Sequence, residues 1–498
     1  MRQASRGCAF PPPPPTPDRL PTPRPPRTRT LRRLACALSA TTLALGAGAE
    51  AASAAFNGGA AAPVYRPGEV VVGYEDGTGA RAQAAAARAV GARAGAATST
   101  RTRVLHVPAG RVRATVARLR RLPGVAYAAP NPVARASQVP GMPDDVGIRG
   151  YPGGLAALQW NFFGPNGVKA LEAWGNVAAA GSPGGRGLRV AVLDTGVAYR
   201  DYGRYKRSPD FANTKFVAAY DFVDGRREVV DRNGHGTHVA GTIAESTNNR
   251  IGVSGLAWGV TLMPIRVLDS NGYGDAATIA KGIRYAARHN AKVINMSLEF
   301  STSVRASEIP DIIAAIRFAN RRGAVVVGST GNEGEARVAY PARAGIVISV
   351  GATTDNACLA SYSNDGVGLD IVAPGGGDDA QLSQDPACVP GHRGPDIYQM
   401  TYAGRSVSKF GLPSGYHGTS MAAPHVSATA ALVIRSGVLG PRPTPAQVEC
   451  RIKATARPLG IPGPNRIYGW GLVDAGAATS PAVATPSCMS RAARANPR

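Results

Sequence analysis

The chain has 498 residues, 44% of them hydrophobic, so it can form two or three units and bury a sizeable core. Its formal charge is +24, and residues 1–140 alone carry 20 Lys and Arg against 5 Asp and Glu. These cations are scattered singly and no aromatic residues alternate with them, which argues against a nucleic-acid-binding protein or a surface-binding one. No run of about 18 apolar residues occurs after residue 55, so we expect no membrane anchor.

Residues 1–55 predict an N-terminal extension followed by a secretory signal peptide. Residues 1–30 are rich in Pro and Arg and cannot form a core. Arg32 and Arg33 then precede an apolar run over 34–49, and small residues follow at 51–55. This order of basic, apolar and small residues is typical of export signals. We therefore expect cleavage near Ala54 and a secreted, extracellular protein.

Residues 56–139 predict a small second unit. Strands are expected at 69–74, 104–107 and 125–128, and helices at 80–90 and 112–122. The resulting β-α-β-α-β order predicts a compact α/β unit of the ferredoxin-like type. A linker rich in Pro and Gly follows at 137–154.

Residues 140–480 predict the main domain, and 481–498 a C-terminal tail. Continuous apolar runs predict strands at 190–193, 292–296, 324–327 and 346–350. Helical patterns lie between them, notably at 276–289 and 309–320. Apolar strands separated by helices imply an α/β fold with a mostly parallel sheet buried on both faces.

The first chemically informative segment ends the strand at 190–193. Asp194, followed by Thr195 and Gly196, stands at the carboxyl end of a buried strand, where open α/β sheets bind ligands. An aspartic protease would need a second motif of this kind, and the sequence has none. A lone capping carboxylate is the alternative.

The second segment spans residues 233–242. Gly234 and Gly236 flank His235 and allow a tight turn before a helix of small residues. His238 follows three residues later, but no third ligand is signalled as a zinc site would require. His238 is therefore predicted to be structural.

The third segment spans residues 417–426. Ser420 follows Gly418 at the expected start of a helix, where the positive helix end favours developing negative charge. The alternative is that Ser420 is only an N-cap. Pro424 is tolerated only in the first turns of such a helix.

Together the three segments resemble the subtilisin-like serine protease family, in which the triad runs Asp, His, Ser along the chain. The resemblance covers about residues 159–478 and implies a three-layer fold and a serine endopeptidase. It makes Asp194 the orienting carboxylate, His235 the general base and Ser420 the nucleophile. Residues 329–334 resemble the family's oxyanion loop, with Asn332 as the donor.

The resemblance also implies two backbone edges between which an extended substrate lies. The implied substrate-binding residues are Gly272, Tyr273, Gly274, Ser297, Leu298, Glu299, Gly331 and Glu333. Many relatives continue Ser-Leu-Gly-Gly where this chain has Glu299 and Phe300 after Leu298. Two interpretations stay open: Glu299 and Glu333 accept Lys or Arg before the scissile bond, or both carboxylates point to solvent.

Residues 248–253 resemble the family's calcium loop, and 208–211 resemble the segment that supplies its carboxylate. Oxygen ligands of this kind suit a hard cation. The implied ligands are Asp210, Thr247, Asn249, Ile251 and Val253. The calcium would be structural, and no cofactor is expected for catalysis.

The unit at 56–139 resembles the family's inhibitory propeptide. This implies a monomeric precursor that its own propeptide inhibits, that removes this propeptide itself, and that then cleaves polypeptide substrates. The alternative is a catalytically silent protein of the same fold that serves as a binding scaffold.

Four of the six cysteines follow the predicted export signal: Cys358, Cys388, Cys450 and Cys488. An even number in an exported protein suggests two disulfides. Three pairings are open, of which Cys358–Cys388 with Cys450–Cys488 is the most local. Four buried free thiols are the alternative.

Overall fold

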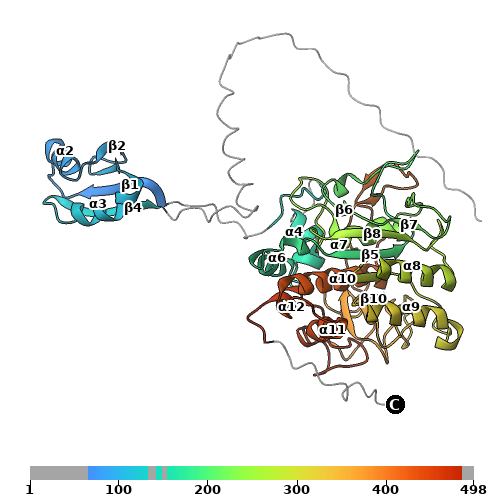
Figure 1. Cartoon of the computed structure of the whole chain (residues 1–498). Helices are drawn as coiled ribbons and strands as arrows, with labels where there is room; N and C mark the ends of the chain where they lie inside the picture. The colour runs from blue at the N-terminus through green and yellow to red at the C-terminus, as the bar shows by residue number, and fades with distance from the viewer. Residues whose placement is uncertain (1–64, 133–141, 149–153, 485–498) are drawn as a thin grey trace, which may run out of the picture. The chain divides into compact units, whose positions relative to one another are not determined.

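The computed structural model describes residues 65–132, 142–148 and 154–484, and the chain divides into two compact units at residues 134/135 (Figure 1). Each unit has its own hydrophobic core. The predicted signal peptide, its cleavage site and Cys488 lie outside the described residues, and the predicted boundaries at 55, 139 and 480 stay predictions.

The N-terminal unit has a four-stranded antiparallel sheet with the strand order β2-β3-β1-β4. Its elements are β1 (Tyr65–Tyr74), α2 (Ala80–Ala89), β2 (Arg93–Ala97), β3 (Thr102–His106), α3 (Val112–Leu119) and β4 (Val125–Pro132). This β-α-β-β-α-β order is ferredoxin-like, as expected. Strand β2 was not predicted, because its small and largely exposed residues give no apolar alternation.

The second unit is built on a parallel sheet with the order β12-β11-β10-β9-β5-β8-β6, in which β7 also pairs with β8. Its strands are β5 (Arg189–Asp194), β6 (Lys215–Phe216), β7 (Tyr220–Asp221), β8 (Thr261–Arg266), β9 (Val293–Met296), β10 (Val325–Ser329), β11 (Ile348–Thr353) and β12 (Ile371–Pro374). Strands β6, β7, β8 and β12 were not predicted. In β8, Pro264 interrupts the pattern, because proline cannot donate to a ladder.

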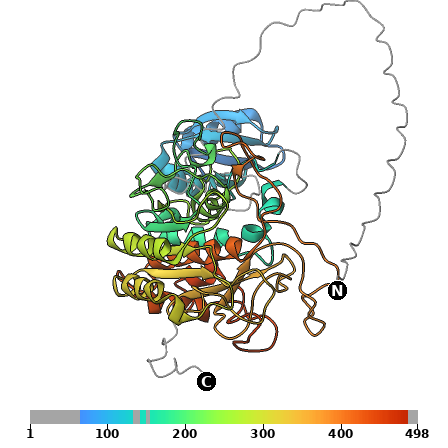
Figure 2. The same ribbon diagram turned by 90° about the vertical axis from the view of Figure 1, so that its right-hand side faces the viewer.

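Helices cover both faces of this sheet, as two separate hydrophobic cores show (Figures 1 and 2). On one face lie α8 (Ala276–Arg288) and α9 (Pro310–Arg321). The other face is covered by α6 (Ala170–Ala179), α7 (His235–Ala244), α10 (Thr419–Ser436), α11 (Pro445–Ala454) and α12 (Ala475–Thr479). The short helices α4 (Gly154–Leu158) and α5 (Trp160–Phe163) precede them. The three-layer α/β prediction is confirmed.

Helix α10 is the central helix of this unit and is buried from Thr419 to Val433. It contains Pro424, whose ring has no N–H to donate to the carbonyl four residues earlier. That carbonyl belongs to Ser420, and it instead accepts a hydrogen bond from Ser297 Oγ at 2.8 Å. The proline therefore ties the start of α10 to the end of strand β9.

Within the described ranges, no helix is long and apolar enough to cross a bilayer.

Cys358 and Cys388 form a disulfide, the more local of the predicted links. Cys450 is also disulfide-bonded, so none of these three is a free thiol. The Cys358–Cys388 bond fastens the loop around Cys388 to the segment after β11. A small hairpin of β13 (Thr401–Tyr402) and β14 (Phe410–Gly411) lies further along the chain.

Candidate active site

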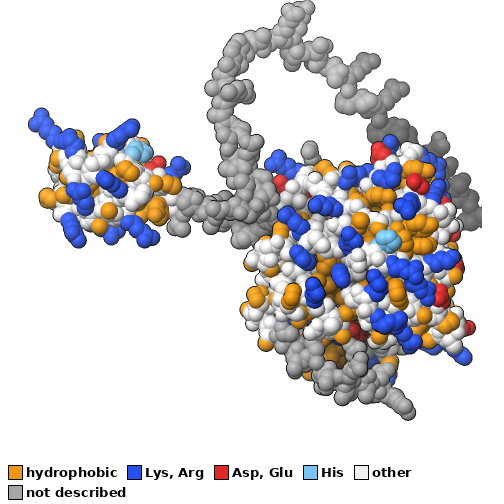
Figure 3. All heavy atoms as spheres, in the orientation of Figure 1, with side chains coloured by type: hydrophobic (Ala, Val, Ile, Leu, Met, Phe, Trp, Pro, Cys, Tyr) orange, Lys and Arg blue, Asp and Glu red, His pale blue; other side chains and the backbone are white. Residues whose placement is uncertain are grey.

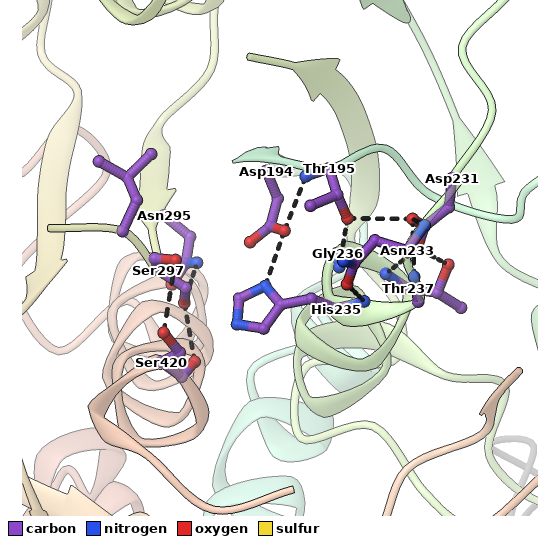
Figure 4. A network of polar contacts seen from close by, with 12 residues as sticks. Asp194, Thr195, Asp231, Asn233, His235, Gly236, Thr237, Asn295, Ser297 and Ser420 are labelled. Atoms are coloured by element: carbon purple, nitrogen blue, oxygen red, sulfur yellow. Dashed lines mark hydrogen bonds and ion pairs between the residues drawn. The ribbon is translucent and has the colours of Figure 1, made fainter. Parts of the chain in front are cut away.

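The parallel sheet brings the three predicted segments to one edge. Asp194 is the last residue of β5, Ser297 follows β9, and Asn332 lies three residues beyond β10. Because these strands are parallel, their carboxyl ends meet at the same edge. Helices α7 and α10 begin here and bring His235 and Ser420 (Figure 4).

His235 is hydrogen-bonded to Asp194. Its Nδ1 donates to Oδ1 of Asp194 at 2.8 Å, and since a carboxylate only accepts, the proton belongs on Nδ1. This leaves Nε2 with a lone pair. Burial opposes a charge on the imidazole, but the carboxylates of Asp194, Asp231 and Glu299 outweigh it and raise the pKa of His235 above its ordinary value. The ring is suited to take up a proton.

Asp231 holds the start of α7 in place. It is fully buried, and its carboxylate accepts hydrogen bonds from both the backbone and the hydroxyl groups around it (Figure 4). Oδ1 accepts from Thr195 Oγ1 at 3.0 Å and from the N–H groups of Asn233 and Gly234 at 2.9 Å. Oδ2 accepts from the N–H and the hydroxyl of Thr237 at 2.9 and 2.6 Å. Asp231 thus links the end of β5 to the helix that carries His235.

Ser420 is the second residue of α10, whose N-cap is Gly418. The N-cap interpretation of Ser420 is therefore wrong. Ser420 Oγ donates to the carbonyl of Ser297 at 3.4 Å, a weak bond that leaves the hydroxyl free to rotate. In Figure 4 the imidazole of His235 lies between the Asp194 carboxylate and the part of α10 that carries Ser420.

Asn332 is oriented by Thr419 and contacts Glu299. Its Oδ1 accepts from the N–H and the hydroxyl of Thr419 at 2.8 and 3.0 Å, and these two bonds fix the orientation of the side-chain amide. Nδ2 donates to Oε1 of Glu299 at 3.3 Å. Burial, followed by the nearby charge of Glu333, raises the pKa of Glu299. Glu299 is therefore half-buried, with its carboxylate against the Asn332 amide.

The remaining predicted substrate-binding residues lie in loops at the same edge. Glu333 is exposed, and its Oε2 accepts from Asn364 Nδ2 at 2.5 Å. Gly331 has a φ of +108°, and a Cβ there would overlap the Asn364 side chain. Gly272 and Gly274 flank Tyr273, which is 77% exposed.

The predicted calcium ligands come together in part. Asp210 is fully buried; its Oδ1 accepts from Asn249 Nδ2 at 2.7 Å and its Oδ2 from the Val253 N–H at 3.0 Å. Burial raises the pKa of Asp210 to about 8. Glu245, also fully buried, has an Oε2 without a hydrogen-bond partner among the described residues. No group of three His, Cys, Asp or Glu in the described chain is arranged to hold a metal ion.

His238 is a buried structural residue, as predicted. Its Nε2 donates to the carbonyl of Ile397 at 2.8 Å, and its ring stacks on Tyr416 with centroids 4.2 Å apart. Burial lowers its pKa to about 3, so the ring stays neutral.

Two supporting residues were missed by sequence reasoning. Asp231 begins a polar turn four residues before His235, and such a turn residue is a usable signal because Asp side chains bind the N–H groups that follow. Ser297 was expected only at the substrate edge. Its bond to the Ser420 carbonyl depends on the packing of β9 against α10, which the sequence does not display.

Comparison with known proteins identifies two regions of the chain. The profile of the subtilase family matches residues 185–471, and that of the fervidolysin N-terminal prodomain matches residues 51–131.

The chain is 38% identical over 295 residues to subtilisin Savinase of Lederbergia lenta, covering 59% of this chain and 91% of that protein. It is 35% identical over 374 residues to a thermophilic serine proteinase of Bacillus sp. (strain AK1), covering 75% and 79% of the two chains.

A solved structure of proteases from Pseudoalteromonas arctica PAMC 21717 matches with a TM-score of 0.52 and 31% identity, over 65% of this chain and 96% of that one. The family profile spans more than half of the sequence. The chain belongs to the subtilase family and is a serine endopeptidase with an N-terminal prodomain.

Proposed function

We propose that Asp194, His235 and Ser420 are the catalytic triad of this endopeptidase and that Asn332 helps to bind the oxyanion. The observation that carries the assignment is the 2.8 Å bond between His235 Nδ1 and Asp194 Oδ1. It fixes the tautomer in which Nε2 can accept a proton, and it stabilises the imidazolium that results.

In this mechanism Ser420 Oγ attacks the carbonyl carbon of a peptide bond while His235 Nε2 takes its proton. The tetrahedral oxyanion receives hydrogen bonds from the Ser420 N–H and from Asn332 Nδ2. The Asn332 amide carries two hydrogens, one of which is donated to Glu299, so the other is available for the oxyanion. His235 then protonates the leaving amine. Water hydrolyses the acyl-enzyme by the reverse proton path.

Substrate binding is proposed to involve the loops after β8, β9 and β10. The extended peptide would lie between residues 272–274 and residues 297–299, with Gly331 and Glu333 beside the residue before the scissile bond. Support comes from the position of these loops, which all follow strands of the sheet edge that carries Asp194.

We further propose that the chain is exported as a precursor and removes its own prodomain. The predicted signal peptide at 1–55, the prodomain match and the triad motivate this sequence of events. The mature protein would be extracellular and monomeric, with a second disulfide joining Cys450 and Cys488.

A structural calcium ion is also proposed, at Asp210 and the loop that follows α7. Asp210 and Asn249 would supply side-chain oxygens, and Thr247, Ile251 and Val253 their carbonyls. The burial of the Asp210 carboxylate without a cationic side chain among its bonded partners supports the site. A hard divalent cation would neutralise that charge.

Casein hydrolysis by the full chain and by its Ser420→Ala form tests the triad. We expect the parent chain to cleave casein and to shorten itself on a gel. The Ser420→Ala form should stay full length, with turnover lower by about 10⁶, the loss known for subtilisin in the same family.

If neither form cleaves casein or is shortened, the silent scaffold becomes the better description. If both forms cleave equally, Ser420 is not the nucleophile.

A further inference from the structure

A surface cleft of about 880 Å³ lies at the edge of the parallel sheet that is opposite the candidate active site. Residues from four separate parts of the chain line it: 187–189, 290 and 292, 320–323, and 434–435 with 441–446. The first three lie at the amino ends of β5, β9 and β10, whose carboxyl ends carry the catalytic segments. The lining holds six cations and no carboxylate, namely Arg189, Lys292, Arg321, Arg322, Arg435 and Arg442.

Three of these cations are held by neutral groups. Arg189 and Arg322 donate to the carbonyls of His289 and Ala287 at 2.9 and 3.1 Å, and Arg435 donates to Ser182 Oγ at 2.9 Å. The other three, Lys292, Arg321 and Arg442, are exposed and make no side-chain hydrogen bond with the described chain. None of the six forms an ion pair with a described carboxylate, so their charges are not neutralised within the cleft.

Helix ends account for only part of this charge. Helices α8, α9 and α10 terminate near the cleft, and basic residues at helix C-termini commonly offset the helix dipole. Each helix end carries roughly −0.5 of an elementary charge, so three ends offset roughly 1.5 of the six positive charges. A substantial positive excess remains. Figure 3 shows the same imbalance more broadly, since Lys and Arg outnumber Asp and Glu on the visible face of this unit.

We propose that this cleft binds a linear polymer of phosphate groups. Five of the six cations are arginines, whose planar guanidinium matches tetrahedral oxyanions with paired hydrogen bonds. The cleft of about 880 Å³ has the volume of roughly thirty water molecules, each of which occupies about 30 Å³ in the liquid, so it has room for several phosphate groups in a row. Its lining contains no aromatic side chain on which a nucleic-acid base could stack, so recognition rests on the phosphates alone.

The position of the cleft leaves catalysis unobstructed. Ser420 and Arg435 stand at opposite ends of α10, and fifteen residues of helix span about 22 Å. A polymer bound at Arg435 therefore lies at the opposite edge of the sheet from the triad. Binding would hold the enzyme on such a polymer while its active site remains open.

The test is titration calorimetry of the full chain with short inorganic polyphosphate at several salt concentrations. Every sample carries Ser420→Ala, so that proteolysis does not change it. The cleft variant combines Lys292→Gln, Arg321→Gln and Arg442→Gln. The control variant removes an equal number of positive charges outside the cleft, by Arg200→Gln, Arg405→Gln and Lys409→Gln. It distinguishes a loss of the cleft from a general loss of positive charge in a chain whose other basic regions also attract anions.

We expect the cleft variant to bind polyphosphate roughly 10–100-fold more weakly than the parent. The slope of log K against the logarithm of the salt concentration should become less steep by about 2, while the control stays close to the parent. Equal losses in both variants, or none in either, would overturn the proposal. So would tighter binding of an oligothymidylate than of polyphosphate, or orthophosphate binding as tightly as the polymer. Should the triple variant melt early, Lys292→Gln alone must still lower the salt dependence.

Discussion

Asp231 shows how one buried carboxylate can support the geometry of Asp194 and His235, the pair that we propose to be catalytic. Its two oxygens accept five hydrogen bonds, from Thr195, Asn233, Gly234 and Thr237. Thr195 Oγ1 in turn accepts from the Gly236 N–H at 3.0 Å. The end of β5 and the first turn of α7 are thereby fixed to one another. The distance between Asp194 and His235 is a consequence of this network.

Glu299 stands at a position where the resemblance to subtilisin-like proteases led us to expect a glycine. A carboxylate next to the Asn332 amide adds negative charge close to the place where the oxyanion would form. It also favours the protonated form of His235, since its charge is one of those that raise the pKa of that ring.

Replacing Glu299 should shift the pH profile. His235 acts as a base only when neutral, so activity falls as the pH drops through its pKa. Glu299→Gln removes a negative charge that raises this pKa, and we expect the acidic limb of kcat/KM to move to lower pH. Glu335→Gln serves as the control, because Glu335 bonds Thr302 and does not contribute to the His235 shift. An unchanged limb in Glu299→Gln would contradict the assignment.

Helix α7 lies so close to β5 that only glycine fits at its second residue. A Cβ at Gly236 would overlap the backbone oxygen of Gly196 and come within 3.0 Å of Asp194 Oδ1. The glycines around His235 therefore serve two purposes. Gly234, with a φ of +109°, turns the chain, and Gly236 allows the helix to approach the strand.

Gly236→Ala should consequently push α7 away from β5 and lengthen the His235–Asp194 bond. We expect kcat/KM to fall by about 10² or more, since displacements near 1 Å can cost that much. The matched change is Gly175→Ala in the exposed part of α6, where a Cβ meets no atom within 4 Å. That variant should gain about 0.5–1 kcal/mol in unfolding free energy and keep its activity. Thermal melting and peptide hydrolysis measure both, and equal behaviour of the two variants would refute the close approach.

At the scale of the whole molecule, buried carboxylates away from the active site bear on stability. Asp210 and Glu245 are fully buried, and mutual repulsion adds to the cost of ionising Glu245. Such an arrangement is costly unless a cation is bound.

Removing calcium should therefore lower the melting temperature. A chelator is expected to lower Tm by roughly 5–15 °C, since saturation of a tight site contributes about 3–4 kcal/mol. Added Ca²⁺ should restore Tm. In the Asp210→Asn form, the chelator should have little further effect. A melting temperature that does not respond to the chelator in the parent chain would exclude the site.

The sequence alone predicted the architecture, which the structure confirms, and it singled out the groups that we propose to react. Apolar strands separated by helices have few ways to be buried, so the three-layer sheet followed from local patterns. Asp194 stood out because it ends a buried strand. His235 and Ser420 stood out because neighbouring glycines allow a tight turn at the start of a helix. Strands β2 and β8 were among those that the sequence analysis missed, since β2 lacks apolar alternation and β8 contains Pro264.

Tertiary structure alone decided which distant side chains meet. The contact of Glu299 with Asn332 and the support that Ser297 gives to Ser420 join segments 33 and 123 residues apart. The cationic cleft is the clearest case of distant side chains that meet. Its basic residues are scattered along the sequence. They converge only where the amino ends of parallel strands and the ends of α9 and α10 come together. Local sequence encodes periodicity and turns, whereas such convergence is set by strand order and helix length, which no single segment displays.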